Sequence, residues 1–226
     1  MAEREKAPGD EALSLADEIQ LALAHTPVSA RDRLRVVFEL DARLARIIAA
    51  TSEPMLGQLR LAWWRDTISQ PASDRPSGDA VLDAIDVHLS GRETGLAELV
   101  DGWEYLLEEP PLSQASAQRF ADGRGAALVG ALTQAAGSQN AAAITAAARC
   151  WSMADLAAKV SQEDERRLLV QLGLASDWPP TKLPREARGL GVLSALAMRS
   201  LKRGGRPLME GRGAALVAMR AGLFGR

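Results

Sequence analysis

The sequence contains few of the residues that most often bind metals or form covalent intermediates. It has one cysteine, Cys150, and two histidines, His25 and His88, among 226 residues. A single cysteine excludes an internal disulfide and a cysteine zinc site, and the two histidines lack the spacing of metal ligands. Neither histidine lies in a motif with a nucleophile, so we expect both on exposed helix surfaces and Cys150 in the core.

Long apolar runs and aromatic residues are also scarce. No window approaches eighteen uninterrupted apolar residues, which argues against a membrane-spanning helix. No charged-then-apolar leader precedes the polar start, so we expect a cytoplasmic protein, with peripheral contact at the inner membrane face left open. Phe, Trp and Tyr together make up only 4% of the chain, so Ala and Leu must fill most of the core.

The apolar pattern predicts an all-α protein, because runs of β-branched residues at period two are absent. We expect a single domain of roughly eight to ten helices over residues 11–226, after a disordered start at 1–10. Ser77, Ser113 and the pair Ser161 and Asp164 have the residue types of helix N-caps. The predicted helices cover residues 11–25, 30–50, 54–69, 78–89, 94–108, 113–136 with an interruption at 123–125, 140–160, 165–172, 183–203 and 212–224.

Charge is distributed unevenly along the chain. Residues 182–226 contain ten Lys or Arg against two acidic residues, whereas the first 181 residues contain seventeen basic and twenty-seven acidic groups. This basic C-terminal region suits anionic lipid or an acidic partner, or it is a solvated face that balances the acidic body. It lacks interleaved aromatic residues and any known DNA-binding motif, so we do not expect nucleic acid as a partner.

The segment 54–69 carries the most informative motif. Pro54 suits the first turn of a helix, where its missing N–H costs no hydrogen bond. On that helix Met55, Leu59 and Trp63 share one face, while Trp64 lies around the side. We therefore expect one tryptophan in the core and the other in a groove.

This segment, together with residues 38–47 (Phe38-Glu39-Leu40-Asp41 and onward to Ile47), resembles the squalene/phytoene synthase family, which has the trans-isoprenyl diphosphate synthase fold. A second likeness covers residues 120–130, where the family has a Tyr before a stretch of small residues beside the isoprenoid. Here that position is Phe120, and the small residues allow either a hydrocarbon or another helix to come close. The ligand or partner candidates are Arg60, Trp63, Trp64, Arg65, Phe120 and Arg124.

Both aspartate-rich motifs of the family are degraded in this chain. Active members carry Asp-Asp-x-x-Asp on an early helix and Asp-x-x-x-Asp on a later one, and these carboxylates hold magnesium ions against the departing diphosphate. The segment 41–45 keeps only the leading Asp41, with alanine at the other two aspartate positions. The matching later segment, 150–159, has no paired carboxylates, and its Lys159 has the wrong charge for a metal site. The resemblance thus implies a vestigial Asp41, no catalytic residues, no metal and no cofactor.

Three hypotheses remain open. The chain is similar to a branch of the family that includes the mitochondrial complex I assembly factor and lacks the aspartate-rich motifs, so the first is an inactive protein that binds an isoprenoid lipid or an unidentified protein partner. The second is an active, magnesium-dependent head-to-head prenyltransferase of isoprenoid (terpenoid) biosynthesis, with carboxylates from other positions. The third is a scaffold whose own side chains fill the cavity. Under the second hypothesis the candidate carboxylates are Asp17, Glu18, Asp41, Asp66 and Asp155.

Overall fold

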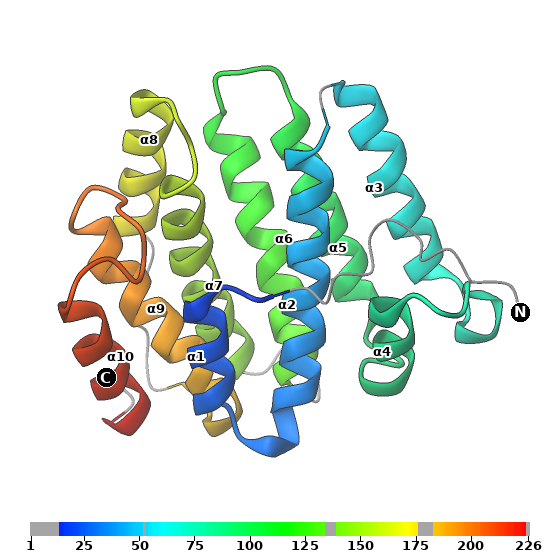
Figure 1. The fold of residues 1–226 in the computed structure, drawn as a ribbon, viewed down its shortest axis with the longest axis horizontal. Helices are drawn as coiled ribbons and strands as arrows, with labels where there is room; N and C mark the ends of the chain where they lie inside the picture. Colours follow the sequence, from blue (N-terminus) through cyan, green and yellow to red (C-terminus); the bar gives the residue numbers. More distant parts are fainter. Residues whose placement is uncertain (1–13, 52, 134–138, 176–182, 225–226) are drawn as a thin grey trace, which may run out of the picture.

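The computed structural model describes residues 14–51, 53–133, 139–175 and 183–224. In these ranges the chain forms ten α-helices, three short 3-10 helices and no strand, which confirms the all-α prediction (Figure 1). The predicted disordered segment 1–10 lies outside the described residues. The helices are α1 Asp17–His25, α2 Val28–Ala49, α3 Pro54–Ser69, α4 Ala80–His88, α5 Glu93–Glu104, α6 Gln114–Leu132, α7 Gln139–Ala157, α8 Glu163–Leu174, α9 Arg188–Leu201 and α10 Gly213–Phe224, with η1 Ala72–Asp74, η2 Tyr105–Leu107 and η3 Arg185–Ala187.

The helices pack as a row with further helices laid against it. In the row α3, α5, α6, α7, α9 and α10 are successive neighbours (Figure 1). Helix α2 lies across α5 and α6, α1 lies against α9, and α8 packs on α7. This arrangement places α2, α5, α6 and α7 around the centre of the molecule.

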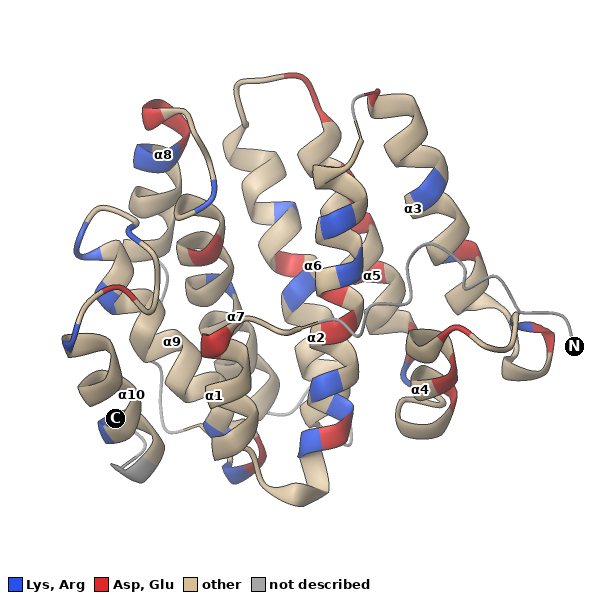
Figure 2. Cartoon of the chain, in the orientation of Figure 1, with Lys and Arg blue, Asp and Glu red and all other residues tan. Residues whose placement is uncertain are grey.

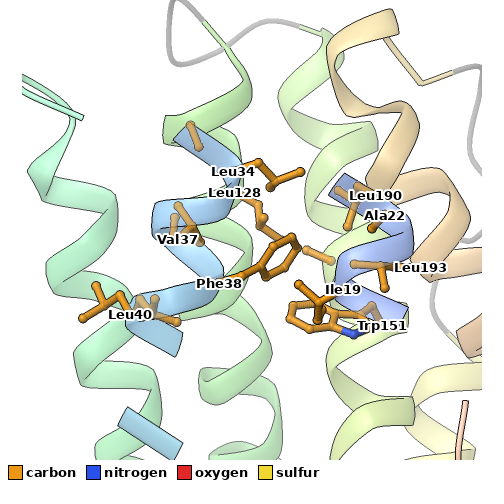
Figure 3. Packing of buried hydrophobic residues seen from close by; sticks show 14 of the residues in the cluster. Ile19, Ala22, Leu34, Val37, Phe38, Leu40, Leu128, Trp151, Leu190 and Leu193 are labelled. Atoms are coloured by element: carbon orange, nitrogen blue, oxygen red, sulfur yellow. The ribbon is translucent and has the colours of Figure 1, made fainter. Parts of the chain in front are cut away.

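Large apolar side chains of α2 form the middle of the core. Along α2, Leu34, Val37 and Phe38 form a stripe at helical spacing, and each is at most 2% exposed. The ring of Phe38 meets the ring of Trp151 on α7 edge to face, with 5.5 Å between their centroids (Figure 3). Such contacts between aromatic rings add to the stabilisation from burial alone. The polar member of that stripe, Asp41, is also buried.

Two of the predicted helix starts can be compared directly with the structure. Ser113 caps α6 as predicted, since its hydroxyl accepts a hydrogen bond from the Ser116 amide at 3.0 Å. The cap of α4 is Asp79 rather than Ser77, because the Asp79 carboxylate accepts from the amides of Val81 and Leu82. A carboxylate at this position satisfies two exposed amides and also complements the helix dipole.

Other predicted helix boundaries were wrong. Helix α1 begins at Asp17, so the described residues just before it are not helical. Helix α8 follows Gln162 without a side-chain cap, and Asp164 lies inside its first turn, paired with Arg167. Helix α6 runs without a break through 123–125, because the glycines there serve close packing rather than a bend.

Glycines let the backbones of α5 and α6 approach each other. A Cβ at Gly123 on α6 would collide with the carbonyl oxygen of Glu98 on α5, and one at Gly102 would lie 3.2 Å from the carbonyl oxygen of Phe120. Small residues on both helices therefore set the distance between them. Of the two readings of the small-residue stretch, the structure shows close helix packing at Gly123.

Within the described ranges, no helix combines the length and the apolar character needed to cross a membrane.

The packing of α6 leads to a paired prediction for stability. We expect Gly123→Ala to lower the free energy of unfolding by about 1–3 kcal/mol, because the new methyl group overpacks the contact with α5. Gly130→Ala on the same helix should be neutral or stabilising by about 0.5–1 kcal/mol, because alanine has the better helix propensity. There the nearest atom to the new methyl group is 3.7 Å away. Urea denaturation of both variants tests this, and equal effects would contradict it.

Candidate binding site

A buried arginine joins the two carboxylates that the resemblance assigns to the two motif regions. Arg124 on α6 is 2% exposed. Its Nε donates to Asp41 Oδ1 at 2.9 Å and its Nη2 to Asp41 Oδ2 at 2.7 Å, which is a bidentate pair with α2. Its Nη1 donates to Asp155 Oδ2 on α7 at 2.9 Å. The guanidinium therefore lies between the two carboxylates and bonds to both.

Three aromatic rings surround the guanidinium. The Arg124 Cζ lies 4.3 Å from the ring centroid of Trp151, 4.4 Å from that of Phe120 and 5.2 Å from that of Trp103. Rings at these distances attract a cation through their negative faces. The Trp103 indole N–H also donates to Asp41 Oδ1 at 2.8 Å, which adds α5 to the same cluster. We call Asp41, Trp103, Phe120, Arg124, Trp151 and Asp155 the arginine cluster.

Asp155 is further neutralised by Lys159. The Lys159 Nζ lies 2.7 Å from Asp155 Oδ1, one helical turn away. Burial of the Asp155 carboxyl by itself raises its pKa, but the charges of Arg124 and then Lys159 outweigh burial and hold that pKa below its ordinary value. Burial of Arg124 by itself lowers its pKa, but the charges of Asp41 and Asp155 outweigh burial and hold that pKa above its ordinary value. The Arg124 and Asp155 side chains are thus charged at neutral pH and compensate each other.

The arrangement leaves little for a metal ion to bind. Only one carboxylate from α2 and one from α7 reach the cluster, and a permanently protonated guanidinium already bonds to both. In the part of the chain that the structure describes, no group of three or more His, Cys, Asp or Glu is placed to hold a metal. Glu18 on α1 faces Asp155 and Lys159, and burial raises its pKa, whereas Asp66 is exposed on α3.

A cavity of about 620 Å³ lies beside the arginine cluster, within the 300–1,000 Å³ range usual for small-molecule sites. It is bounded by the last turns of α2 and α7, the start of α6 and α8, and the segment that follows α5. Phe120, Trp103 and Asp155 form the wall shared with the cluster. The other apolar lining includes Ala45, Ile48, Ala49, Leu106, Leu112, Leu156 and Val160, and the other charged lining is Arg46, Glu108, Glu109, Lys159 and Glu165.

The tryptophan pair divides between core and surface. Trp64 is 4% exposed and packs beneath Arg43, whereas Trp63 is 48% exposed, so one tryptophan is in the core as expected. The face that Trp63 shares with Met55 and Leu59 is the exposed face of α3. Residue spacing alone does not predict which side of α3 is buried, because the helix carries apolar residues on two sides. The packing of α3 on α5 determines the buried side.

The remaining candidates have separate surroundings. Arg65 links α3 to α5 through Asp101 at 2.8 Å and Glu104 at 3.0 Å, and Arg60 is exposed. Phe120 lines the cavity, whereas Arg124 lies behind the wall and is not among the lining residues.

Sequence reasoning missed three members of this region, which are Trp103, Trp151 and Lys159 as the partner of Asp155. The four-residue spacing of Asp155 and Lys159 was a visible signal for that pair. Nothing in the local sequence indicated that Trp103 and Trp151 meet around Arg124, because the three residues come from different helices.

Searches against protein-family models, curated proteins and solved structures gave no match for this chain.

The arginine cluster predicts a large loss of stability on neutralising Arg124. Arg124→Met leaves Asp41 without a cation and Asp155 with Lys159 alone, so we expect the free energy of unfolding to fall by about 3–5 kcal/mol. Adding Asp41→Asn and Asp155→Asn should recover part of the loss, because no buried charge then lacks a partner. Urea denaturation of the wild type, the single variant and the triple variant measures both effects.

A matched control lies on the same two helices. Arg149 on α7 pairs with Asp122 on α6 at 2.7 Å, but both side chains are about half exposed. Arg149→Met should cost about 0–1 kcal/mol, as is usual for exposed ion pairs. A similar cost for Arg124→Met and Arg149→Met would contradict a structural role for the buried cluster.

Proposed function

We propose that this chain is a catalytically inactive, squalene/phytoene synthase-like protein that binds an uncharged, elongated apolar molecule of isoprenoid type in the cavity beside the arginine cluster. The single observation that carries the proposal is the position of Arg124 between Asp41 and Asp155. This placement is what supports a binding role rather than prenyl transfer.

The need to stabilise a departing diphosphate argues against prenyl transfer in this chain. Release of a diphosphate from an allylic carbon needs several positive charges at one place, supplied in this chemistry by metal ions on clustered carboxylates. Here the two carboxylates are already bonded to a guanidinium, which itself is enclosed by rings and is not directed at the cavity. At least two carboxylates from each of two facing helices would favour catalysis, and the described residues supply one from each.

The lining of the cavity favours an uncharged ligand. Just over half of the lining residues are apolar or aromatic, and they supply the contacts that a hydrocarbon needs. Its charged lining comprises four carboxylates against Arg46 and Lys159, and Lys159 is already paired with Asp155. An anionic head group would meet a net negative wall, so the cavity favours an alcohol or a hydrocarbon over a diphosphate.

A ligand-dependent melting experiment tests this proposal. We expect farnesol to raise the melting temperature of the protein, because a ligand that binds only the folded state stabilises it. Farnesyl diphosphate with magnesium should produce a smaller shift and no release of pyrophosphate. Pyrophosphate release above the protein-free rate would overturn the inactive assignment, and equal shifts with the two ligands would overturn the choice of an uncharged ligand.

A pair of alanine variants locates the binding. Ala45 lines the cavity and Ala142 is exposed on α7 away from it. Ala45→Phe should fill part of the cavity and abolish the farnesol shift, whereas Ala142→Phe should leave it unchanged. A shift that survives Ala45→Phe would show that farnesol binds elsewhere.

A second candidate function, binding of a protein partner as an assembly-type factor, is favoured by the exposed apolar face of α3. Met55, Leu59 and Trp63 are 71%, 62% and 48% exposed and recur at four-residue intervals. A stripe of this kind fits the apolar face of an amphipathic helix, and tryptophan is frequent at the centres of protein interfaces. It supports a scaffold role that does not depend on the cavity.

Site-specific photo-crosslinking in the native cell tests the second function. A photoreactive residue at Leu59 should give a discrete protein adduct, which Trp63→Ala weakens severalfold, while the same group at exposed Gln118 on α6 should not. Trp63→Ala should change stability by no more than about 1 kcal/mol, in contrast to a loss of about 3–5 kcal/mol for the buried Trp64→Ala. Equal adducts from both positions would contradict a binding face on α3.

A further inference from the structure

The end of the chain forms a strongly basic surface. Between Arg199 and Arg220 the sequence has six Lys or Arg and a single acidic residue, Glu210. Figure 2 shows these cations in the turn between α9 and α10 and on α10 itself. The exposed residues of this set are Lys202, Arg203, Arg206, Arg212 and Arg220.

Internal pairing leaves much of this charge uncompensated. Glu210 forms ion pairs with two cations, since its carboxylate lies 3.2 Å from Arg203 and 3.3 Å from Arg206. Within the described part of the chain, Lys202, Arg212 and Arg220 form no ion pair. The surface therefore has a net positive charge.

Apolar side chains lie among these cations on the outer side of α10. The inner side of the helix buries Ala214 and Ala218, while Leu216 is 67% and Met219 51% exposed. Leu216 is one helical turn before Arg220, and Arg212 directly precedes the first residue of α10. The outer side of α10 thus has two apolar side chains bracketed by arginines.

We propose that this surface, made of the α9–α10 turn and the outer side of α10, docks on an anionic lipid bilayer. Leu216 and Met219 enter the boundary between head groups and acyl chains, and the surrounding Lys and Arg contact the lipid phosphates. Charge complementarity selects this occupant. A duplex or single-stranded nucleic acid would use the cations but would leave the two apolar side chains exposed to water, and no aromatic side chain lies among them for base stacking.

The α3 face shows why apolar exposure alone is not sufficient. On α3, Arg65 is neutralised by Asp101 and Glu104, and the exposed Arg60 is offset by the exposed Asp66 of the same helix, so α3 has no comparable excess of positive charge. The exposed apolar residues there predict no preference for anionic lipid. Docking through α10 does not depend on the proposed ligand of the cavity. The exposed apolar face of α3 provides a control for the vesicle-binding experiment.

Vesicle co-sedimentation of the full chain tests the inference. We expect binding at least tenfold stronger to vesicles of phosphatidylcholine with a quarter phosphatidylglycerol than to phosphatidylcholine alone, and weaker binding as salt rises. The double variant Leu216→Asp and Met219→Asp, and separately Arg212→Gln with Arg220→Gln, should each lower the affinity at least tenfold. Thermal melting should confirm that these exposed substitutions leave the fold intact.

The control variant is Leu59→Asp on α3, which should retain wild-type affinity for the vesicles. Equal binding to neutral and anionic vesicles, or no binding to either, would overturn the inference. A loss of binding in Leu59→Asp as large as that in the α10 variants would overturn it too, as would tighter binding of an oligonucleotide that displaces the vesicles.

Discussion

The bond between Arg124 and its two carboxylates is the constraint on which the centre of this molecule depends. It joins α6 to α2 through Asp41 and to α7 through Asp155, and Trp103 adds α5. A buried guanidinium is costly to desolvate, so it is tolerated only where carboxylates and rings replace its water. Arg124, Asp41 and Asp155 lie on three different helices. The positions of these helices must therefore match for the buried charges to compensate each other.

The same bond is the reason we propose binding rather than prenyl transfer at the cavity. The carboxylates that would hold metal ions are bonded to a cation from the protein itself, and the rings close over it. The space beside the cluster remains open at about 620 Å³, with an apolar lining and a slight excess of acidic groups. The three proposed binding surfaces therefore differ in chemistry: the cavity has an apolar lining, the face on α3 is apolar, and the face on α10 is both basic and apolar.

Local sequence predicted the elements better than their contacts. Pro54 and the apolar spacing predicted α3 over its observed range, and Asp41 was identified as the one carboxylate kept from the first motif. The pairing of Asp41 with Arg124 spans 83 residues, so no local pattern indicates it. The choice between Trp63 and Trp64 likewise depended on which side of α3 meets α5. The cap of α4 depended on a single residue, Asp79, close to another candidate, Ser77.

The most direct test of the central claim is electron paramagnetic resonance of Mn²⁺, a spectroscopic substitute for magnesium, mixed with farnesyl diphosphate. The account predicts that adding the protein leaves the Mn²⁺ spectrum the same as in the protein-free mixture, because Arg124 already bonds to Asp41 and Asp155. A protein-dependent change in the spectrum that Asp41→Asn removes would contradict it, since that carboxylate would then be available to a metal.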